Sequence, residues 1–455
     1  YFTLAVTQPS TASLGGGGVC LVHDKKKKVT EVIDFLPRAG STATGARLAT
    51  GVPGAVRGFY ALHAKYGKFR WESLLAEGER LARLGTPVSR AFAADLAVGA
   101  RLLANDPIAR QVFLAGGRPL AEGQTFEQHD LASVYARIRR APGDFYTGVF
   151  AQSLVTAVDN AGGTRTTADL ANMRPNAGPA LTVRHGDDLI HFAPPPAVGG
   201  AVASRMVAAL EGRWAAAAVD ERPHLLAETA ARAFAERGQW MNPDGSARAA
   251  FYSGSGKGML DAYDPARHQP VQADRPNDAV PASSFVVLDA DGNGVACNVT
   301  TYGLFGTGRM LAGTGLFMAA ASGVTSGPPA VGPVMVINPT VQELRFAAAA
   351  SGGVTGAPAL TQVLLDAQIA GVKLAAAVAA PRIHHSGNPD VAFIEEGTGE
   401  AGAGALAQRG HQDKAVPLPS RVNALQCATG RPNFGKCEIV ADPRGFGMAV
   451  MVGKD

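Results

Sequence analysis

The stretch VPASSFVVLDADGNGVACNVTTYGLFGTG, residues 280–308, decides the fold. An alternating apolar run at 285–288 leads into a turn rich in Asp, Asn and Gly at 289–294, and a second alternating run follows at 295–301. This pattern predicts a β-hairpin. The small residues Ala-Ser-Ser at 282–284 stand at its leading end. If the hairpin begins a new chain after self-cleavage, one of these three residues should be a nucleophile.

The composition indicates an ordinary globular protein with a large core, arranged as one big domain or two. Its 455 residues are 46% hydrophobic and 18% charged, and the net charge is only +4. Because this small excess is spread along the chain, it argues against a nucleic-acid partner. No apolar run is long enough to predict a membrane span. The one basic cluster, Lys25 to Lys28, lies between two strand-like runs and is typical of a solvated turn.

The order of the predicted elements favours an α+β or α/β sandwich. Strands are predicted at 19–23 and 29–35, and a loop-rich, exposed segment at 242–281 precedes the hairpin. Apolar spacing of three and four residues predicts helices between these two parts of the chain and again after the hairpin. The main helical segments are expected within 53–103 and near 128–140, 148–161, 200–212, 357–371 and 373–379.

Glycine and histidine patterns exclude some site types. The glycine clusters do not form a phosphate-binding motif. Gly352 and Gly353 follow an apolar run, so they form either an ordinary turn or a pair of backbone N–H donors aimed into a site. His384 and His385 are adjacent, so on a regular element they point to different sides, and we interpret them as structural. We therefore expect no metal and no cofactor.

The four cysteines divide into two kinds. Cys20 and Cys297 lie in apolar, strand-like runs, and we expect them to be buried free thiols. Cys427 and Cys437 flank a turn-prone loop between two predicted strands, and we expect them to form a disulfide.

Nine stretches of the chain, in this order, carry a resemblance to one family. They are LAVTQPSTASLGGGG, IDFLPRAG, LATGVPGAVRGFYALHAKYG, FAPPPAVGG, the hairpin with FGTG, INPT, SGG, APRIHH and ADPRG. The sequence resembles the gamma-glutamyltransferase family of N-terminal nucleophile (Ntn) hydrolases over nearly its whole length. The first match falls after the family's opening helix, which leads us to expect a further N-terminal segment.

The resemblance implies a four-layer αββα sandwich and a precursor that cuts itself ahead of a Thr. The freed Thr supplies a hydroxyl nucleophile and an α-amino base, attacks a small-molecule amide, and passes the acyl group to water or an amine. Gly352 and Gly353 would form the oxyanion hole, and Thr300 matches the family's second threonine. Residues 1–281 and 282–455 would become the large and small subunits of a heterodimer, which pairs further as one option. The family's usual export implies the periplasm or cell exterior, with the cytoplasm as the alternative.

The nucleophile position departs from the family. It falls on Ala282, which has no group to attack with. Three explanations are open: the nucleophile has been replaced to trap the uncut chain, Ser283 acts instead with the strand start shifted by one residue, or the protein is an inactive relative. We favour Ser283, although a one-residue shift turns side chains to the other face of a strand.

The substrate clamp departs as well. The family's Arg position is Leu36, with Arg38 two residues on, and the Asn position after the second threonine is Tyr302. The acidic pair corresponds to an apolar stretch beginning at Phe317, and a Ser pair corresponds to Met335 and the next residue, Val336. A site for a zwitterion loses binding without its charge partners. We therefore expect an apolar acyl pocket lined near these residues, or else a gamma-glutamyl clamp rebuilt around Arg38.

Overall fold

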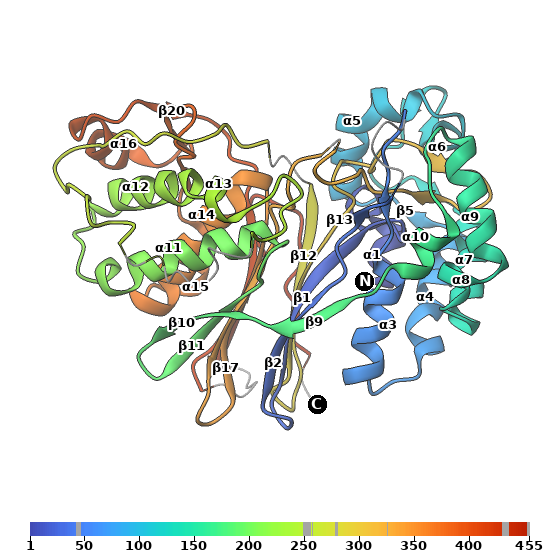
Figure 1. Ribbon diagram of the computed structural model, residues 1–455, viewed down its shortest axis with the longest axis horizontal. Coiled ribbons are helices and arrows are strands. Elements are labelled where there is room, and N and C mark those ends of the chain that lie inside the picture. The colour runs from blue at the N-terminus through green and yellow to red at the C-terminus, as the bar shows by residue number, and fades with distance from the viewer. Residues whose placement is uncertain are drawn as a thin grey trace.

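The structure is a computed structural model that describes residues 1–41, 47–248, 256, 258–277, 281–324, 326–429 and 436–452. Two sheets of mainly antiparallel strands form its centre (Figure 1). The first sheet has the order β12 (Ala282–Leu288), β13 (Gly294–Thr300), β1 (Gly17–Asp24), β2 (Val29–Asp34) and β9 (Asn176–Pro179). The second has the order β10 (Leu181–His185), β11 (Asp188–Phe192), β16 (Pro333–Asn338), β17 (Glu343–Ser351), β21 (Arg421–Cys427) and β22 (Cys437–Val440).

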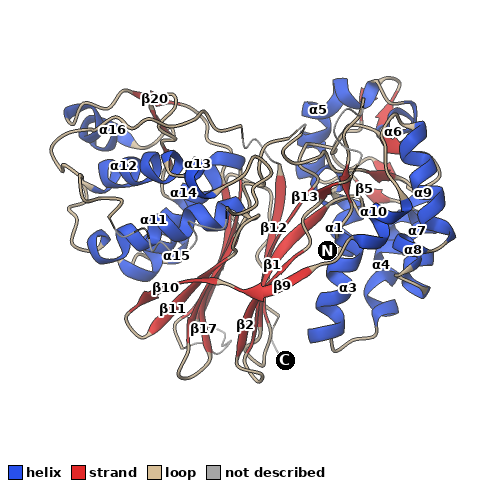
Figure 2. Ribbon diagram, viewed as in Figure 1, coloured by secondary structure: helices blue, strands red, loops and turns tan. Residues whose placement is uncertain are grey.

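Helices cover the outer face of each sheet (Figure 2). The first sheet is covered by α1 (Phe2–Thr7), α2 (Pro9–Ala12), α3 (Ala55–Tyr66), α4 (Trp71–Leu84), α5 (Arg90–Ala104), α6 (Pro107–Phe113), α7 (His129–Arg140), α8 (Asp144–Thr147), α9 (Val149–Asn160) and α10 (Thr167–Asn172). The second is covered by α11 (Val198–Trp214), α12 (Arg222–Ala235), α13 (Arg237–Trp240), α14 (Gly356–Leu364), α15 (Leu374–Ala379) and α16 (Gly399–Gln408). These layers confirm the predicted αββα sandwich, and the helices for which bounds were predicted lie within two residues of them when the π-helical turn is counted with α14.

Short elements complete the two outer layers. A 3-10 turn (Gly353–Thr355) follows β17, and a π-helical turn (Leu365–Ile369) extends α14. The short strands are β3 (Arg38–Ala39), β4 (Gly51–Val52), β5 (Thr86–Pro87), β6 (Leu114–Ala115), β7 (Arg118–Pro119), β8 (Thr125–Phe126), β14 (Met310–Leu311), β15 (Leu316–Phe317), β18 (Ile383–His384), β19 (Ala392–Ile394) and β20 (Asp413–Ala415). Among the described residues, no helix is both long and apolar enough to cross a membrane.

The core has three apolar layers because side chains alternate along the strands. On β1, Val19 and Leu21 pack into the cluster between the two sheets, whereas Cys20 and Val22 pack against the helices that cover the first sheet. A third cluster fills the space between the second sheet and α11 to α15. The lysines at 25–28 form the turn between β1 and β2, as predicted.

The regions before and after the predicted processing junction are interleaved. β12 and β13 lie after the junction but pair with β1 in the first sheet. β11 lies before the junction but pairs with β16 in the second sheet. Each sheet is therefore built from both regions, so cleavage at 281/282 would leave two fragments that share both sheets.

Candidate active site

The hairpin brings the two ends of the opening motif together. Ala282, the first residue of β12, lies directly opposite Thr300, the last residue of β13. The buried Thr300 Oγ1 donates a hydrogen bond to the Pro281 carbonyl oxygen at 2.7 Å and accepts one from the Tyr302 N–H at 2.9 Å. The threonine therefore contacts the backbone at the predicted junction. Val280, at the edge of that junction, is outside the described residues.

Ala282 and Ser283 face opposite sides of the first sheet. Ala282 packs with Val286 and Leu288 into the cluster between the sheets. The Ser283 Oγ instead lies 2.6 Å from the Thr11 Oγ1 on α2, in the helical layer. In this register the side chain beside Thr300 is that of Ala282, and Ser283 would reach the same place only after a shift of one residue.

Gly352 and Gly353 follow β17, so they belong to the second sheet, opposite the hairpin. Asn298, on the same face of β13 as Thr300, donates to the Ala350 carbonyl oxygen at 2.8 Å, just before the end of β17. Gly352 and Gly353 follow with φ of 118° and 61°, which glycine adopts without strain. A Cβ on Gly352 would also lie only 2.5 Å from the Ser420 Cα. Both observations explain glycine here, and the role as oxyanion hole stays a prediction.

Three of the five predicted pocket residues come together. Leu36, Tyr302 and Met335 are buried in the same cluster between the sheets as Ala282. Phe317 instead packs in an aromatic cluster beside α5 and α6, and Val336 faces the helices on the second sheet. Because Met335 and Val336 are neighbours on β16, they point to opposite faces. The structure therefore does not place Phe317 and Val336 with the other three.

Arg38 lies beside this cluster but already has a partner. Its Nη2 is 3.5 Å from the Asp34 Oδ2, and its side chain is about half exposed. Asp34 is buried and accepts the Leu36 N–H at 2.9 Å. Burial raises the pKa of the Asp34 carboxyl, and the hydrogen bond from Leu36 and the charge of Arg38 oppose that change. The pKa of Tyr302 is raised well above its usual value by burial and, to a lesser degree, by Asp34. Asp34 was not among the predicted site residues, although it lies in the quoted IDFLPRAG.

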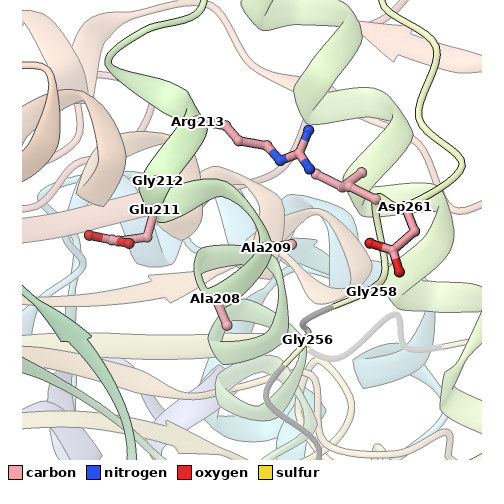
Figure 3. Close-up of a pocket in the computed structure, with 9 residues that line it drawn as sticks. Ala208, Ala209, Glu211, Gly212, Arg213, Gly256, Gly258 and Asp261 are labelled. Carbon is pink, nitrogen blue, oxygen red and sulfur yellow. The ribbon is translucent and has the colours of Figure 1, made fainter.

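A separate pocket of about 390 Å³ lies at the C-terminal half of α11 (Figure 3). Its charged lining residues are Glu211, Arg213 and Asp261, and none of its lining residues belongs to β12, β13 or β17. Glu211 is already engaged by His185 at 2.7 Å. This pocket is therefore not the predicted acyl pocket.

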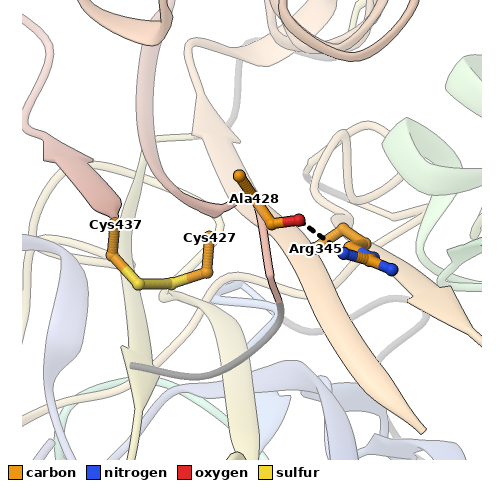
Figure 4. Close-up of a disulfide and its surroundings, with 4 residues drawn as sticks. All are labelled: Arg345, Cys427, Ala428 and Cys437. Atoms are coloured by element: carbon orange, nitrogen blue, oxygen red, sulfur yellow. Dashed lines mark hydrogen bonds between the residues drawn. A yellow bond between two sulfur atoms is a disulfide. The ribbon is translucent and has the colours of Figure 1, made fainter. Parts of the chain in front are cut away.

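The cysteine predictions divide into one that is confirmed and one that is wrong. Cys427 and Cys437 are opposite each other on β21 and β22 and form the predicted disulfide (Figure 4). Beside this bond, Arg345 donates to the Ala428 carbonyl oxygen. Cys20 and Cys297 are not free thiols but form a second disulfide, because β1 and β13 pair in a register that places them opposite each other. Their Cα atoms are 4.2 Å apart although 277 residues separate them in the sequence.

Comparisons with known proteins agree with this architecture. The family model described as gamma-glutamyltranspeptidase matches residues 1–326 and 329–452. The chain is 26% identical to a glutathione hydrolase proenzyme of Escherichia coli, over 97% of this chain and 85% of that protein. It is 28% identical to a glutathione hydrolase proenzyme of Bacillus subtilis, over 99% and 86% of the two chains.

A solved structure shares the whole fold. The cephalosporin acylase from Bacillus halodurans superposes with a TM-score of 0.83 at 20% identity, covering 100% of this chain and 90% of that one. The interleaved sheets, the hairpin that begins at Ala282 and the full-length family match lead to one conclusion. The chain belongs to the gamma-glutamyltranspeptidase family of Ntn hydrolases and acyltransferases.

Proposed function

We propose that this protein hydrolyses or transfers an amide-linked acyl group that is less polar than the gamma-glutamyl group. The observation that supports this is the common cluster of Leu36, Tyr302 and Met335 with Ala282. These positions correspond to those of the family's polar clamp. A zwitterionic acyl group would be desolvated there without charge partners, which is unfavourable. Relatives named glutathione hydrolase and a neighbour titled cephalosporin acylase share the fold, so the fold alone does not select the acyl group.

The reaction needs a nucleophile, and Ser283 is the first candidate. The chain would cut itself ahead of Ser283, and the freed α-amino group would accept the hydroxyl proton as Oγ attacks the amide carbon. The C–N bond then breaks, the amine leaves with that proton, and water or a second amine releases the acyl group from Oγ. This arrangement needs the start of β12 to shift by one residue.

An uncut precursor is the second candidate, and the observed register favours it. Ala282 occupies the place beside Thr300, while the Ser283 hydroxyl is engaged by Thr11 on the far face. In this case the chain keeps the family's fold without a nucleophile.

Three versions of the full chain separate these candidates: the unaltered protein, Ser283→Ala and Ala282→Thr. If Ser283 acts, the unaltered chain yields a fragment whose N-terminal sequence is Ser-Ser-Phe, and Ser283→Ala abolishes it. If the chain is an uncut precursor, only Ala282→Thr is cleaved, and its fragment begins Thr-Ser-Ser. The gels must contain reductant, because the Cys20–Cys297 bond would hold the two fragments together. Absence of cleavage in all three versions would contradict the junction itself.

The acyl preference is tested on whichever version is cleaved. We expect short-chain acyl anilides to be better substrates, by kcat/KM, than the gamma-glutamyl anilide. A strong preference for the gamma-glutamyl anilide, lost in Arg38→Ala through a higher KM, would overturn the proposal and make Arg38 the rebuilt clamp.

We also propose that the two fragments stay together as a heterodimer in an oxidising compartment, the periplasm or the cell exterior. Both disulfides support this, since all four cysteines are paired and stable disulfides are rare in the cytosol. Cell fractionation tests the location, and a cytoplasmic protein with four free thiols would contradict it.

A further inference from the structure

Four histidines and one glutamate from distant parts of the chain meet in the helical layer over the second sheet. His224 and Glu228 lie four residues apart, and therefore on the same face, of α12. His268 lies in the loop that follows Asp261, the last residue of the pocket lining. His385 directly follows β18, and His411 comes shortly after α16. Two groups within this histidine cluster, His268/His385/His411 and His224/Glu228/His411, each have their candidate ligand atoms within 4.8 Å of one another.

Glu228 supplies the negative charge of the cluster and is completely buried. Its Oε2 accepts a hydrogen bond from the Arg232 Nη1 at 2.5 Å, which balances the charge of that arginine. Its Oε1 lies 2.5 Å from the His268 Nδ1 and 3.7 Å from the His411 Nε2. One carboxylate oxygen is therefore directed at the imidazole rings rather than at the arginine.

The outer nitrogens of two rings are held by acceptors. The His224 Nε2 lies 2.9 Å from the Asp264 carbonyl oxygen, which can only accept, so this nitrogen carries the proton. The His224 Nδ1 then has a lone pair, and it points at the His411 Nε2, 2.7 Å away. The His268 Nε2 lies 3.1 Å from the Asp390 Oδ1. Histidines that bind metal commonly donate their far N–H to a carbonyl or carboxylate in this way.

His411 completes the argument because its Nε2 faces two other groups of the cluster. The residue is buried, and its Nδ1 has no hydrogen-bond partner within the described ranges. Its Nε2 faces the lone pair of the His224 Nδ1 and the Glu228 Oε1 at once. A cation between these three atoms would satisfy all of them, whereas a single proton satisfies only one contact.

We propose that the histidine cluster binds one divalent transition metal of the zinc class through the His224 Nδ1, Glu228 Oε1 and His411 Nε2, while the His268 Nδ1 stays hydrogen-bonded to Glu228. Metal–ligand bonds of about 2.0–2.1 Å place tetrahedral ligands about 3.3 Å apart. The His411 Nε2 lies 2.7 Å from the His224 Nδ1 and 3.7 Å from the Glu228 Oε1, so both separations reach that value with shifts below about 1 Å. His385 lies against the His411 ring, with 5.8 Å between ring centroids, and borders the site without belonging to the group of His224, Glu228 and His411.

The placement indicates a structural site that goes beyond the proposed function. All three ligands are buried in the helical layer, so a substrate has no access to the metal. His224, Glu228 and His268 precede the predicted junction, while His411 follows it. The metal would therefore join the two fragments in the second helical layer.

Zinc and cobalt uptake by the full-length protein tests this site. After treatment with a chelator, we expect the protein to bind one Zn²⁺ per chain by calorimetry and to gain the visible absorption of tetrahedral Co²⁺ with one equivalent of cobalt. His411→Ala and Glu228→Gln should abolish both signals. The matched controls are His384→Gln, a buried neighbour whose ring packs on Phe234, and the exposed His129→Ala, and both should retain them.

The outcomes separate a metal site from a proton-sharing cluster. No stoichiometric uptake by the unaltered chain, or uptake that persists in both ligand variants, overturns the proposal. If the variants do not fold, the cobalt spectrum of the unaltered chain decides: a tetrahedral spectrum supports the site, and its absence rejects it. Because metal uptake does not depend on cleavage or acyl transfer, failure here leaves the proposed function untouched.

Discussion

The Cys20–Cys297 disulfide and the histidine cluster are two of the places where residues on the two sides of the predicted junction meet. The disulfide lies in an apolar layer between the first sheet and its helices, and its sulfur atoms need no further partners. The histidine cluster lies in the opposite helical layer and consists of polar groups that depend on one another. The free-energy cost of burying these polar groups is offset only while each group keeps its hydrogen-bond or ion-pair partners.

This difference indicates which substitutions should destabilise each region. In the apolar layers on the two faces of the first sheet, strand register decides which cysteines pair. Single buried polar side chains such as Asn298 are the exceptions there, and each needs hydrogen-bond partners. In the histidine cluster, the loss of one group leaves several others buried without partners. The predictions below test this contrast, from the largest expected change in stability to the smallest.

Removal of the long-range disulfide should cause the largest loss of stability. In the chain-entropy description, a bond that closes 277 residues stabilises the uncut chain by about 6 kcal/mol, whereas one that closes 10 residues contributes about 3 kcal/mol. Cys20→Ala/Cys297→Ala should therefore lower the free energy of unfolding more than Cys427→Ala/Cys437→Ala. Urea unfolding without reductant measures both, and equal losses would contradict the loop-length argument.

Glu228→Leu should lower the free energy of unfolding by about 3–5 kcal/mol, because Arg232 would keep a buried charge without its partner. The double variant Glu228→Leu/Arg232→Met should recover most of this loss. Glu77→Leu is the control, since Glu77 also pairs with an arginine but on the surface, and it should leave stability nearly unchanged. If Glu228→Leu changes the free energy of unfolding as little as Glu77→Leu does, the groups of the histidine cluster do not depend on one another.

Asn298→Ala should cost about 2–3 kcal/mol, because it removes the partners of two buried backbone groups. Asn298 donates to the Ala350 carbonyl oxygen at 2.8 Å and accepts the Gly332 N–H at 3.2 Å. The exposed Asn160→Ala serves as the control. If Asn298→Ala lowers the free energy of unfolding in urea no more than Asn160→Ala does, water replaces both hydrogen bonds of Asn298.

Asp34→Asn tests the buried carboxylate near the junction, the counterpart of Glu228, and its effect should be the smallest. Burial raises the pKa of Asp34 above its ordinary value of 3.8, so the folded protein keeps this proton where the unfolded chain has lost it. Stability from this group is present at low pH and declines as pH rises from 3.8 through the raised pKa. The difference in unfolding free energy between the unaltered protein and Asp34→Asn should therefore decrease over that range. A difference that increases with pH would show that Arg38 outweighs burial.

Much of the fold could be predicted from local sequence. The 282–301 hairpin, the main helices and the Cys427–Cys437 bond follow from periodicity and turn residues close together in the chain. The opposition of Ala282 and Thr300 follows from hairpin length in the same way. The β10–β11 hairpin and the place of Asp34 beside the predicted site were not predicted. The histidine cluster was not predicted either, although the i,i+4 spacing of His224 and Glu228 was a signal for it.

Residue type and short-range spacing predicted the layered sandwich and the 282–300 hairpin, whereas the processing junction and the loss of the polar clamp stay predictions from the family resemblance. The folded chain was needed to show that Cys20 pairs with Cys297, which way Ser283 points, and that Phe317 and Val336 lie apart from Leu36. It also brought together His224, His268, His385 and His411, which no local pattern connects. Strand register and the packing of distant elements set these neighbours, since one residue of register turns a side chain to the other face.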